Sequence, residues 1–284
     1  MKVTKVLYLY LLLLGVIIVA MVGLRQYIGL NLPLEPRDLE EIREEGVMRI
    51  AIEYNTTSYF VSGDSIAGLE YELCRAIERY SGLKVELYPE MNLAHSLQGL
   101  QKQQYDVVAR SIPITAEVKQ SFLFTEPIET NRLVLVQRNA DANKGIQPIR
   151  NQLDLAGKTV YIPEESGARQ RISNLAQEIA DSIFFKEDPL YGEEQLIMRV
   201  ADGQIDYAIC DERIASRFVS IYPQIDILTA VGFNQFRGWA LRKDSPVLCD
   251  SLNSWLKQEI SSPRFKVLQQ KYLDTPKNSR KNKR

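Results

Sequence analysis

Two residues of opposite charge stand at the ends of short apolar runs and could hold a small charged solute. Arg110 follows the run Asp106–Ala109, and Asp211 follows the run Ile205–Cys210. A guanidinium binds a carboxylate through two parallel hydrogen bonds, and an aspartate attracts an ammonium group. The two residues therefore suit an amino acid or the end of a peptide. The alternatives are that they pair with each other across a closed cleft or lie in separate surface networks.

A third candidate group follows the apolar run Thr159–Ile162. We expect Ser166 to cap the helix that starts next to Gly167, so that free backbone amides and the helix dipole face an anion. Two aromatic residues, Tyr54 and Tyr59, follow the first apolar run of the chain and could stack on the body of a ligand. They could equally be buried core aromatics, and the sequence leaves both interpretations open.

These residues lie between segments that alternate between strand-like and helix-like patterns. The apolar residues of Leu69–Tyr80, for example, recur in steps of three and four, which is typical of a helix. Strands that alternate with helices predict parallel sheets with helices on both faces, which bind ligands at the carboxyl ends of the strands. The expected strands are Val47–Glu53, Lys84–Leu87, Asp106–Ala109, Thr159–Ile162, Ile183–Phe185 and Ile205–Cys210, and the expected helices are Leu69–Tyr80, Leu93–Gln103, Ala168–Ala180, Glu193–Asp202 and Arg213–Ile221.

The same order of elements occurs twice, which predicts two α/β lobes. Arg132–Gln137 and Ile225–Val231 are apolar and lack helical periodicity, and we expect them to be the strands that cross between the lobes. After Phe236 the sequence again predicts a strand and two helices, which complete the first lobe. The expected divisions are a membrane segment and linker at 1–31, lobe 1 at 39–133 plus 238–276, lobe 2 at 134–237, and a disordered basic tail at 277–284.

The N-terminus carries an uncharged run of nineteen residues, Val6–Leu24, after Lys2 and Lys5. This length is close to the roughly 20 residues of a transmembrane helix, and the lysines favour a cytoplasmic N-terminus. We therefore expect an N-terminal transmembrane helix that anchors an exported chain to the inner membrane, on its periplasmic side. A cleaved signal peptide is the alternative, although its apolar run is usually shorter and ends in a small-x-small site.

The composition excludes several functions. The 35 basic and 36 acidic residues leave a net charge of -1, so nothing suggests nucleic acid as a partner. The single histidine, His95, and three widely spaced cysteines form no zinc-binding pattern, and no glycine-rich phosphate loop occurs. We expect no metal and no cofactor. Cys74 and Cys210 fall in a predicted helix and a predicted strand, and we interpret both as small core residues.

Six stretches between residues 68 and 245 form a recognisable set. They are GLEYEL at Gly68–Leu73, DVVARSIPITAE at Asp106–Glu117, FLFTEPI at Phe122–Ile128, LAGKTVYIPEESG at Leu155–Gly167, IDYAICDERIASRF at Ile205–Phe218 and GWALRKDS at Gly238–Ser245. On these stretches the chain resembles the bacterial extracellular solute-binding proteins of family 3, and especially the non-catalytic N-terminal module of membrane-bound lytic transglycosylase F. The resemblance implies an α/β, two-lobed clamshell of the periplasmic-binding-protein type (type II), with the ligand in the cleft.

The resemblance also implies roles for residues. In amino-acid-binding members of the family, an arginine after a T-x-E stretch holds the carboxylate of the ligand, and an aspartate of the second lobe holds its ammonium. Asp211 matches that aspartate, but Val118 stands at the position of the arginine. We take Arg110, where the family usually has a small residue, as the replacement. With the matching cleft positions and the two tyrosines, the predicted ligand-binding residues are Arg110, Asp211, Ser111, Thr115, Ser166, Gly167, Tyr54 and Tyr59.

The sequence thus predicts a membrane-tethered periplasmic solute-binding protein that captures an amino acid, a short peptide or a cell-wall fragment, for transport or sensing. The expected protein partner is an ABC permease or an envelope enzyme, and the expected state is a monomer. Only residues 273–284 follow the last expected helix, so we expect no catalytic domain, no glycoside cleavage and no enzyme. Two alternatives stay open, namely a dehydratase-type or lyase-type clamshell enzyme that uses Glu164, Glu165 or Asp211, and a degenerate module that only contacts another protein.

Overall fold

Both faces of the first sheet are buried, because apolar residues occupy successive positions of its central strands. Its strands are β1 (Val47–Glu53), β4 (Lys84–Glu90), β5 (Val107–Pro113), β6 (Phe122–Phe124), β7 (Glu129–Asn131) and β13 (Gln235–Arg242). Ile50 and Ile52 of β1 pack on one face, and Ala51 packs on the other. The strand order is β4-β1-β5-β13-β6, in which β1 is parallel to β4 and β5, and β13 is antiparallel to β5, β6 and β7.

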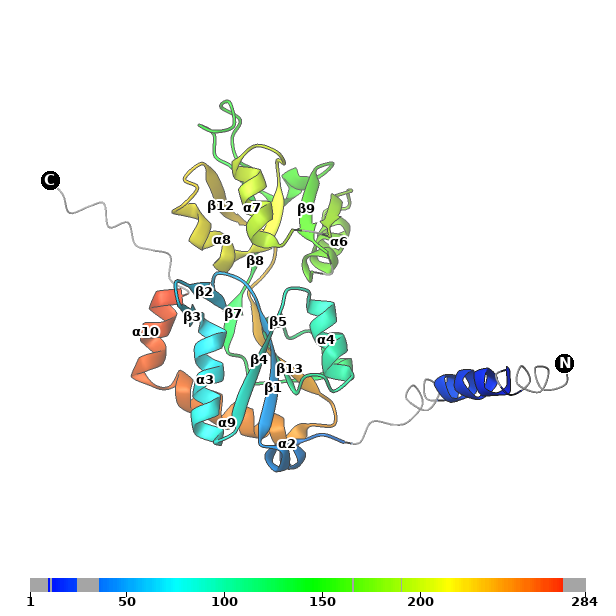
Figure 1. Cartoon of the computed structure of the whole chain (residues 1–284). Helices are drawn as coiled ribbons and strands as arrows, with labels where there is room; N and C mark the ends of the chain where they lie inside the picture. The colour runs from blue at the N-terminus through cyan, green and yellow to red at the C-terminus, as the bar shows by residue number, and fades with distance from the viewer. Residues whose placement is uncertain (1–9, 11, 25–35, 165, 190, 273–284) are drawn as a thin grey trace. The chain divides into compact units, whose positions relative to one another are not determined.

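Helices cover the two faces of this sheet. They are α2 (Leu39–Glu45), α3 (Leu69–Ser81), α4 (Leu93–Gln101), α5 (Val118–Ser121), α9 (Pro246–Ile260) and α10 (Pro263–Tyr272). Residues of α2, α3, α9 and α10 share one core cluster with the sheet, whereas α4 and α5 pack on the other face. A small hairpin of β2 (Phe60–Ser62) and β3 (Ser65–Ala67) precedes α3. The carboxyl ends of β1 and β5 face the second lobe (Figure 1).

The second lobe repeats the arrangement around its own sheet. It consists of β8 (Leu133–Arg138), the short helix η1 (Gln152–Leu155), β9 (Thr159–Pro163), α6 (Ala168–Glu178), β10 (Phe184–Asp188), α7 (Glu193–Ala201), β11 (Ala208–Asp211), α8 (Glu212–Val219) and β12 (Ile225–Ala230). The strand order is β10-β9-β11-β8-β12, with β9, β10 and β11 parallel. One face packs against α6 and η1, and the other packs against α7 and α8.

The two apolar stretches that we expected to cross between the lobes belong to the second sheet. Arg132–Gln137 largely forms β8 and Ile225–Val231 largely forms β12, and these two strands pair with each other in antiparallel fashion. The crossing-strand prediction was therefore wrong, because β8 pairs with β11 inside the second sheet and β12 pairs with β8 at its edge. The chain crosses instead at Arg132, between β7 and β8, and at residues 231–234, between β12 and β13. β13 begins at Gln235, three residues before the expected return of the chain to lobe 1.

Gly68 fixes the loop that follows β1 against the start of α3. Its φ of +138° is a conformation that L side chains rarely adopt, and a Cβ there would lie 2.0 Å from the carbonyl oxygen of Ser58. The close approach lets the amide of Leu69 donate to the carbonyl of Thr57 (2.7 Å) and the amide of Tyr71 donate to that of Ser58 (3.1 Å). The glycine of the GLEYEL stretch is thus required by the backbone itself.

We expect Gly68→Ala to lower the free energy of unfolding by about 1–3 kcal/mol, because backbone atoms must move to admit the methyl group. Gly82, at the other end of α3, is the matched control, since its φ is +70° and nothing lies within 4 Å of its added Cβ. Urea unfolding of both variants measures the difference. Equal losses for Gly68→Ala and Gly82→Ala would show that the close approach contributes nothing.

The computed structural model describes residue 10 and residues 12–24, 36–164, 166–189 and 191–272, and it divides into two units, Met1–Pro36 and Arg37–Arg284. Residues 12–24 are helical. Within the described residues no helix combines the length and the apolar character that a bilayer crossing needs. The predicted span Val6–Leu24 begins outside the described residues, and the predicted tail 277–284 also lies outside them. The three cysteines are buried and unpaired, which confirms Cys74 and Cys210 as core residues.

Candidate functional site

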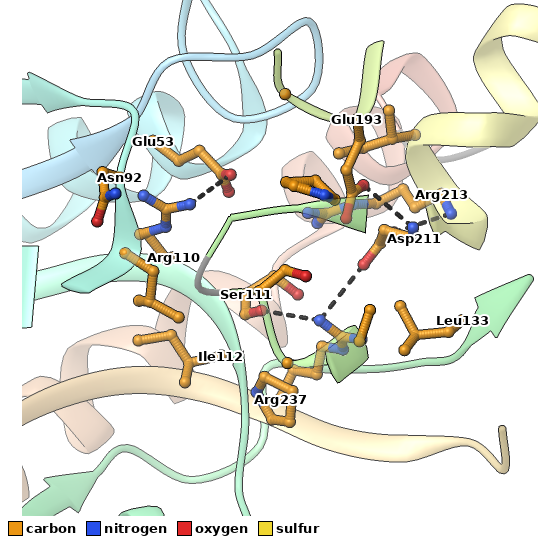
Figure 2. Close-up of a pocket in the computed structure, with 18 of the residues that line it drawn as sticks. Glu53, Asn92, Arg110, Ser111, Ile112, Leu133, Glu193, Asp211, Arg213 and Arg237 are labelled. Atoms are coloured by element: carbon orange, nitrogen blue, oxygen red, sulfur yellow. Dashed lines mark hydrogen bonds and ion pairs between the residues drawn. The ribbon is translucent and has the colours of Figure 1, made fainter. Parts of the chain in front are cut away.

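A cavity of about 150 Å³ lies where the two lobes meet, at the carboxyl ends of β1, β5, β9 and β11 (Figure 2). Charged side chains from both lobes line it, which is the arrangement that the sequence predicts for the carboxyl ends of parallel strands. The first lobe contributes Glu53, Arg110 and Arg237, and the second contributes Glu193, Asp211 and Arg213. Arg110 and Asp211 thus line one cavity.

Arg110 has partners within its own lobe. Arg110 is the middle residue of β5, which runs on to Pro113. Its Nη2 donates to Glu53 Oε1 at 2.7 Å, and its Nη1 donates to the carbonyls of Glu90 (3.3 Å) and Met91 (3.1 Å). The side chain is nearly buried. Neither alternative from the sequence holds, because Arg110 does not pair with Asp211 and the two do not lie in separate surface networks. Figure 2 shows the Glu53–Arg110 pair at one end of the cavity and Asp211 at the other.

Asp211 is held in place by the start of α8. Its Oδ1 accepts from the amide of Arg213 at 3.0 Å, as an N-cap residue does, and from Asn131 Nδ2 at 2.5 Å. Its Oδ2 is left to face Arg237 Nη1 at 3.4 Å. One oxygen therefore fixes the carboxylate, and the other is available to the cavity.

Arg237 is a cavity residue that the sequence analysis missed. It lies in β13 of the first lobe and is almost fully buried; its Nη1 donates to the carbonyl of Ser111 at 3.0 Å. Its Nε is buried and has no hydrogen-bond partner among the described residues. The signal that could have identified it is a charge directly before the apolar stretch 238–241 of an expected strand, because a charge in a buried strand needs a partner or a ligand.

Glu193, at the first position of α7, is the second residue that was missed. Its Oε2 accepts from the backbone amide of Asp211 at 3.0 Å. Burial and the nearby carboxylates of Asp211 and Glu53 raise the pKa of Glu193 to about 8. At neutral pH this carboxyl therefore holds a proton, so the cavity carries less negative charge than its residue types suggest.

We expect Glu193→Gln to remove a pH dependence of stability. The folded protein keeps the Glu193 proton up to a pKa of about 8, whereas the unfolded chain loses it near the ordinary pKa of about 4.3. The unfolded state therefore binds fewer protons between these values, and the contribution of Glu193 to stability falls as pH rises from 5 to 8. The stability of Glu193→Gln relative to wild type should grow across this window in urea unfolding. A constant difference from pH 5 to 8 would contradict the raised pKa.

A buried arginine joins the lobes beside the cavity. Arg213 Nη1 of α8 lies 2.8 Å from Glu129 Oε1 of β7 and 3.4 Å from Glu70 Oε1 of α3. Burial alone would lower the pKa of Arg213, but the two carboxylates raise it. Burial raises the pKa of Glu70. A further contact between the lobes runs from the amide of Thr56 to Glu194 Oε1, at 2.8 Å.

The smaller predicted residues divide into those on the cavity wall and those away from it. Ser111, Ser166 and Gly167 line the cavity, and the Ser111 hydroxyl donates to Glu129. Ser166 was wrongly predicted as the cap of α6, because Gly167 takes the N-cap position and no side chain caps the helix. The Ser166 hydroxyl is instead buried without a hydrogen-bond partner among the described residues. The amides at the start of α6 are therefore free of any side-chain cap.

Thr115, Tyr54 and Tyr59 are not on the wall of this cavity, contrary to the prediction. Thr115 Oγ1 accepts from the amide of Val118 at 3.3 Å and so starts α5. Tyr59 packs against the core of the first lobe, with its ring 6.0 Å from that of Tyr71, which fits the core interpretation. Tyr54 is exposed. Glu164 lines the cavity from the end of β9, and Glu165 lies outside the described residues.

Nothing in the described part of the chain resembles a metal centre, since no three His, Cys, Asp or Glu side chains there could hold an ion together. The cavity can hold a ligand through hydrogen bonds and ion pairs with its charged and polar side chains. Its second-lobe wall presents an acceptor, Asp211 Oδ2, and donors at Ser166 and the start of α6, while the first-lobe wall presents two arginines. Such a set can bind a solute that carries both a cationic and an anionic group.

The sequence of residues 48–275 matches the model of a family described as bacterial extracellular solute-binding proteins, family 3. The membrane-bound lytic murein transglycosylase F of Aeromonas hydrophila is 27% identical over 264 residues, which cover 89% of this chain and 52% of that protein. This chain therefore spans about half the length of the curated relatives that it matches.

Two solved structures have the same fold. The L-arginine-bound substrate-binding protein AbpA of an amino acid ABC transporter from Streptococcus pneumoniae matches with a TM-score of 0.70 at 23% identity, over 83% of this chain and 98% of that one. An ancestral amino-acid-binding protein, described as a precursor of cyclohexadienyl dehydratase, matches with a TM-score of 0.70 at 22% identity, over 83% and 99%. They confirm the predicted two-lobed α/β clamshell.

Proposed function

This chain belongs to the bacterial extracellular solute-binding proteins of family 3, and on that basis we propose that it captures a small zwitterionic solute between its two lobes. The observation that carries the proposal is the convergence of Asp211 from one lobe and of two arginines from the other on a single cavity. Because the cavity measures about 150 Å³, below the roughly 300–1,000 Å³ of pockets for drug-sized ligands, a single amino acid fits it better than a peptide or a cell-wall fragment.

Each wall of the cavity has a role in this proposal. Asp211 receives the ammonium group on its Oδ2, since its Oδ1 is already bonded. The first-lobe arginines attract the carboxylate, and the hydroxyl of Ser166 and the uncapped amides next to Gly167 donate to it from the second lobe, since the start of a helix attracts an anion. The charge of Arg110 and the hydroxyl of Ser111 complete the polar lining. A solute held by both lobes would favour the closed arrangement, with a hinge at the two crossings.

Location and partners extend the proposal. The extracellular family and the membrane-bound relatives support a periplasmic location. We propose further that the N-terminal segment tethers the chain to the inner membrane, and that the closed form is recognised by an ABC permease for transport or by an envelope enzyme for sensing. Carbonate extraction of cell membranes tests the tether. The full chain should stay in the membrane pellet, and its release into the supernatant would contradict the anchor.

Thermal unfolding of the full chain in mild detergent tests the binding function. The probes are the twenty standard L-amino acids, alanyl-alanine and N-acetylmuramyl dipeptide, each at 1 mM. A solute present at a hundred times its dissociation constant stabilises the folded state by about 2.7 kcal/mol, so at least one amino acid should raise the melting temperature by several degrees. Unchanged melting temperatures with every probe would contradict solute capture.

A clamshell enzyme is the second candidate, and Glu193 supports it. A carboxyl group with a pKa of about 8 can donate or accept a proton near neutral pH, as a general acid or base must. The structural neighbour described as a precursor of cyclohexadienyl dehydratase belongs to the same fold. If this candidate is correct, an amino acid that binds should be converted by the wild type and left intact by Glu193→Gln, as nuclear magnetic resonance of the mixture would show.

A further inference from the structure

We propose that Arg237, and not Arg110, anchors the carboxylate of the solute, and that the solute binds by ion-pair exchange, its ammonium taking the place of Arg237 on Asp211. This inference rests on the proposed function and makes it more specific. It assigns the carboxylate to a residue outside the predicted site. It also restricts the ligand class to solutes with a free ammonium and a free carboxylate, such as α-amino acids.

The hydrogen bonds of Arg110 leave it little to offer a solute. Its Nη2 is bonded to Glu53 at 2.7 Å, a distance typical of a strong charge-assisted bond, and its Nη1 is bonded to the carbonyl of Met91 at 3.1 Å, with a longer contact of 3.3 Å to that of Glu90. A carboxylate placed on Arg110 would also lie beside the Glu53 carboxylate, which repels it. Arg110 therefore acts as a fixed part of the wall that holds Glu53 and the end of β4 at residues 90–91.

Arg237 is bonded more loosely. Its contact with Asp211 Oδ2 is 3.4 Å, beyond the 2.7–3.2 Å range of ordinary N–H···O bonds, and its Nε is buried without a hydrogen-bond partner among the described residues. One strong bond, from Nη1 to the carbonyl of Ser111, fixes the guanidinium in the cavity wall. A buried donor without a partner is unfavourable, and a carboxylate is the group that satisfies it best.

The state of Asp211 completes the exchange. Its Oδ1 has two donors, whereas within the described part of the chain Arg237 is the only partner of its Oδ2. A zwitterion that enters between the two side chains gives Asp211 an ammonium and gives Arg237 a carboxylate, so that both charges remain paired. An amine alone would leave Arg237 unpaired, and a carboxylic acid alone would leave Asp211 unpaired. In either case a buried charge would be left unpaired, which is costly. The cavity should therefore reject amines that lack a carboxylate and carboxylic acids that lack an ammonium.

Isothermal titration of the full chain in detergent tests the exchange. The probes are the twenty L-amino acids and then the α-carboxamide of the one that binds tightest, which keeps the ammonium and removes the negative charge. We expect the wild type to prefer the acid by about 10–100-fold, the worth of a hydrogen bond to a charged group. Arg237→Gln should reduce this preference to about threefold or less. Arg110→Gln, which changes the cavity wall, should weaken the acid and the carboxamide alike and so keep their ratio at the wild-type value.

The outcomes separate the inference from the proposed function. Amino acids that bind, with a preference that survives in Arg237→Gln and disappears in Arg110→Gln, would overturn the inference and leave the proposed function intact. The absence of any amino-acid binding to wild type would overturn both. Arg237→Lys keeps the charge but not the two-pronged geometry, and it should show an intermediate preference. If Arg237→Gln does not fold, Arg237→Lys replaces it in the test. A preference for the acid over the carboxamide equal to that of wild type would then count against the inference.

Discussion

Replacing Arg213 with methionine should lower the free energy of unfolding by about 3–5 kcal/mol, the usual effect of removing one partner from a buried ion pair. Arg213 is almost fully buried and bonds to Glu129 of the first lobe at 2.8 Å, with Glu70 at 3.4 Å. Without it, the carboxylates of Glu70 and Glu129 lose the one cation that the described residues place beside both of them. Urea unfolding of the full chain, followed by circular dichroism, measures the loss.

The control for this prediction is an exposed arginine of the same lobe. Arg169 pairs with Glu187 at 3.4 Å and its side chain is 62% exposed, so Arg169→Met should cost no more than about 1 kcal/mol. Adding Glu70→Gln to Arg213→Met should recover part of the loss, because it removes one of the two unpaired charges. A loss for Arg213→Met as small as that of the control would contradict the role of this residue in joining the lobes.

Asp211→Asn should weaken the binding of the tightest amino acid by about 2–5 kcal/mol, roughly 30-fold or more. The substitution removes the charge that faces the cavity but keeps an oxygen that can accept from the Arg213 amide and so cap α8. The effect should therefore appear in affinity rather than in folding. Isothermal titration measures the affinity, and the melting temperature without ligand reports on the fold.

Asp206→Asn is the matched control for this second prediction. Asp206 lies just before the same strand, β11, but its side chain is 72% exposed and pairs with Arg138 at 2.6 Å. Its replacement should leave the affinity for amino acids within about twofold of wild type, as expected for a surface ion pair. Equal losses in the two variants would mean that Asp211 has no special part in binding.

Local patterns in the sequence predicted most elements of the fold. The run Val47–Glu53 forms a strand with the expected bounds, and Leu69–Tyr80 forms a helix that extends by one residue. Both succeed because burial leaves a local signal: β1, buried on two faces, has a nearly continuous apolar run, and α3, buried on one face, has apolar residues at helical spacing. The strands β8 and β12 were found as strands but assigned to the wrong place, since periodicity gives no information on which strands pair.

The site depended on contacts that sequence patterns do not encode. The partner of Arg110 is Glu53, 57 residues away, and Arg237 approaches Asp211 only because β13 returns to the first sheet. The raised pKa of Glu193 results from burial and from carboxylates on two other strands. The ends of parallel strands indicated where charged residues would gather. Which charges pair with each other followed from the tertiary structure alone.

A crystal structure of the chain with the amino acid that most raises its melting temperature would test the central claim most directly. The account predicts one solute in the cavity between the lobes, with its ammonium within hydrogen-bond distance of Asp211 Oδ2 and its carboxylate on an arginine of the first lobe. A solute bound on an outer surface, or in contact with one lobe alone, would contradict it.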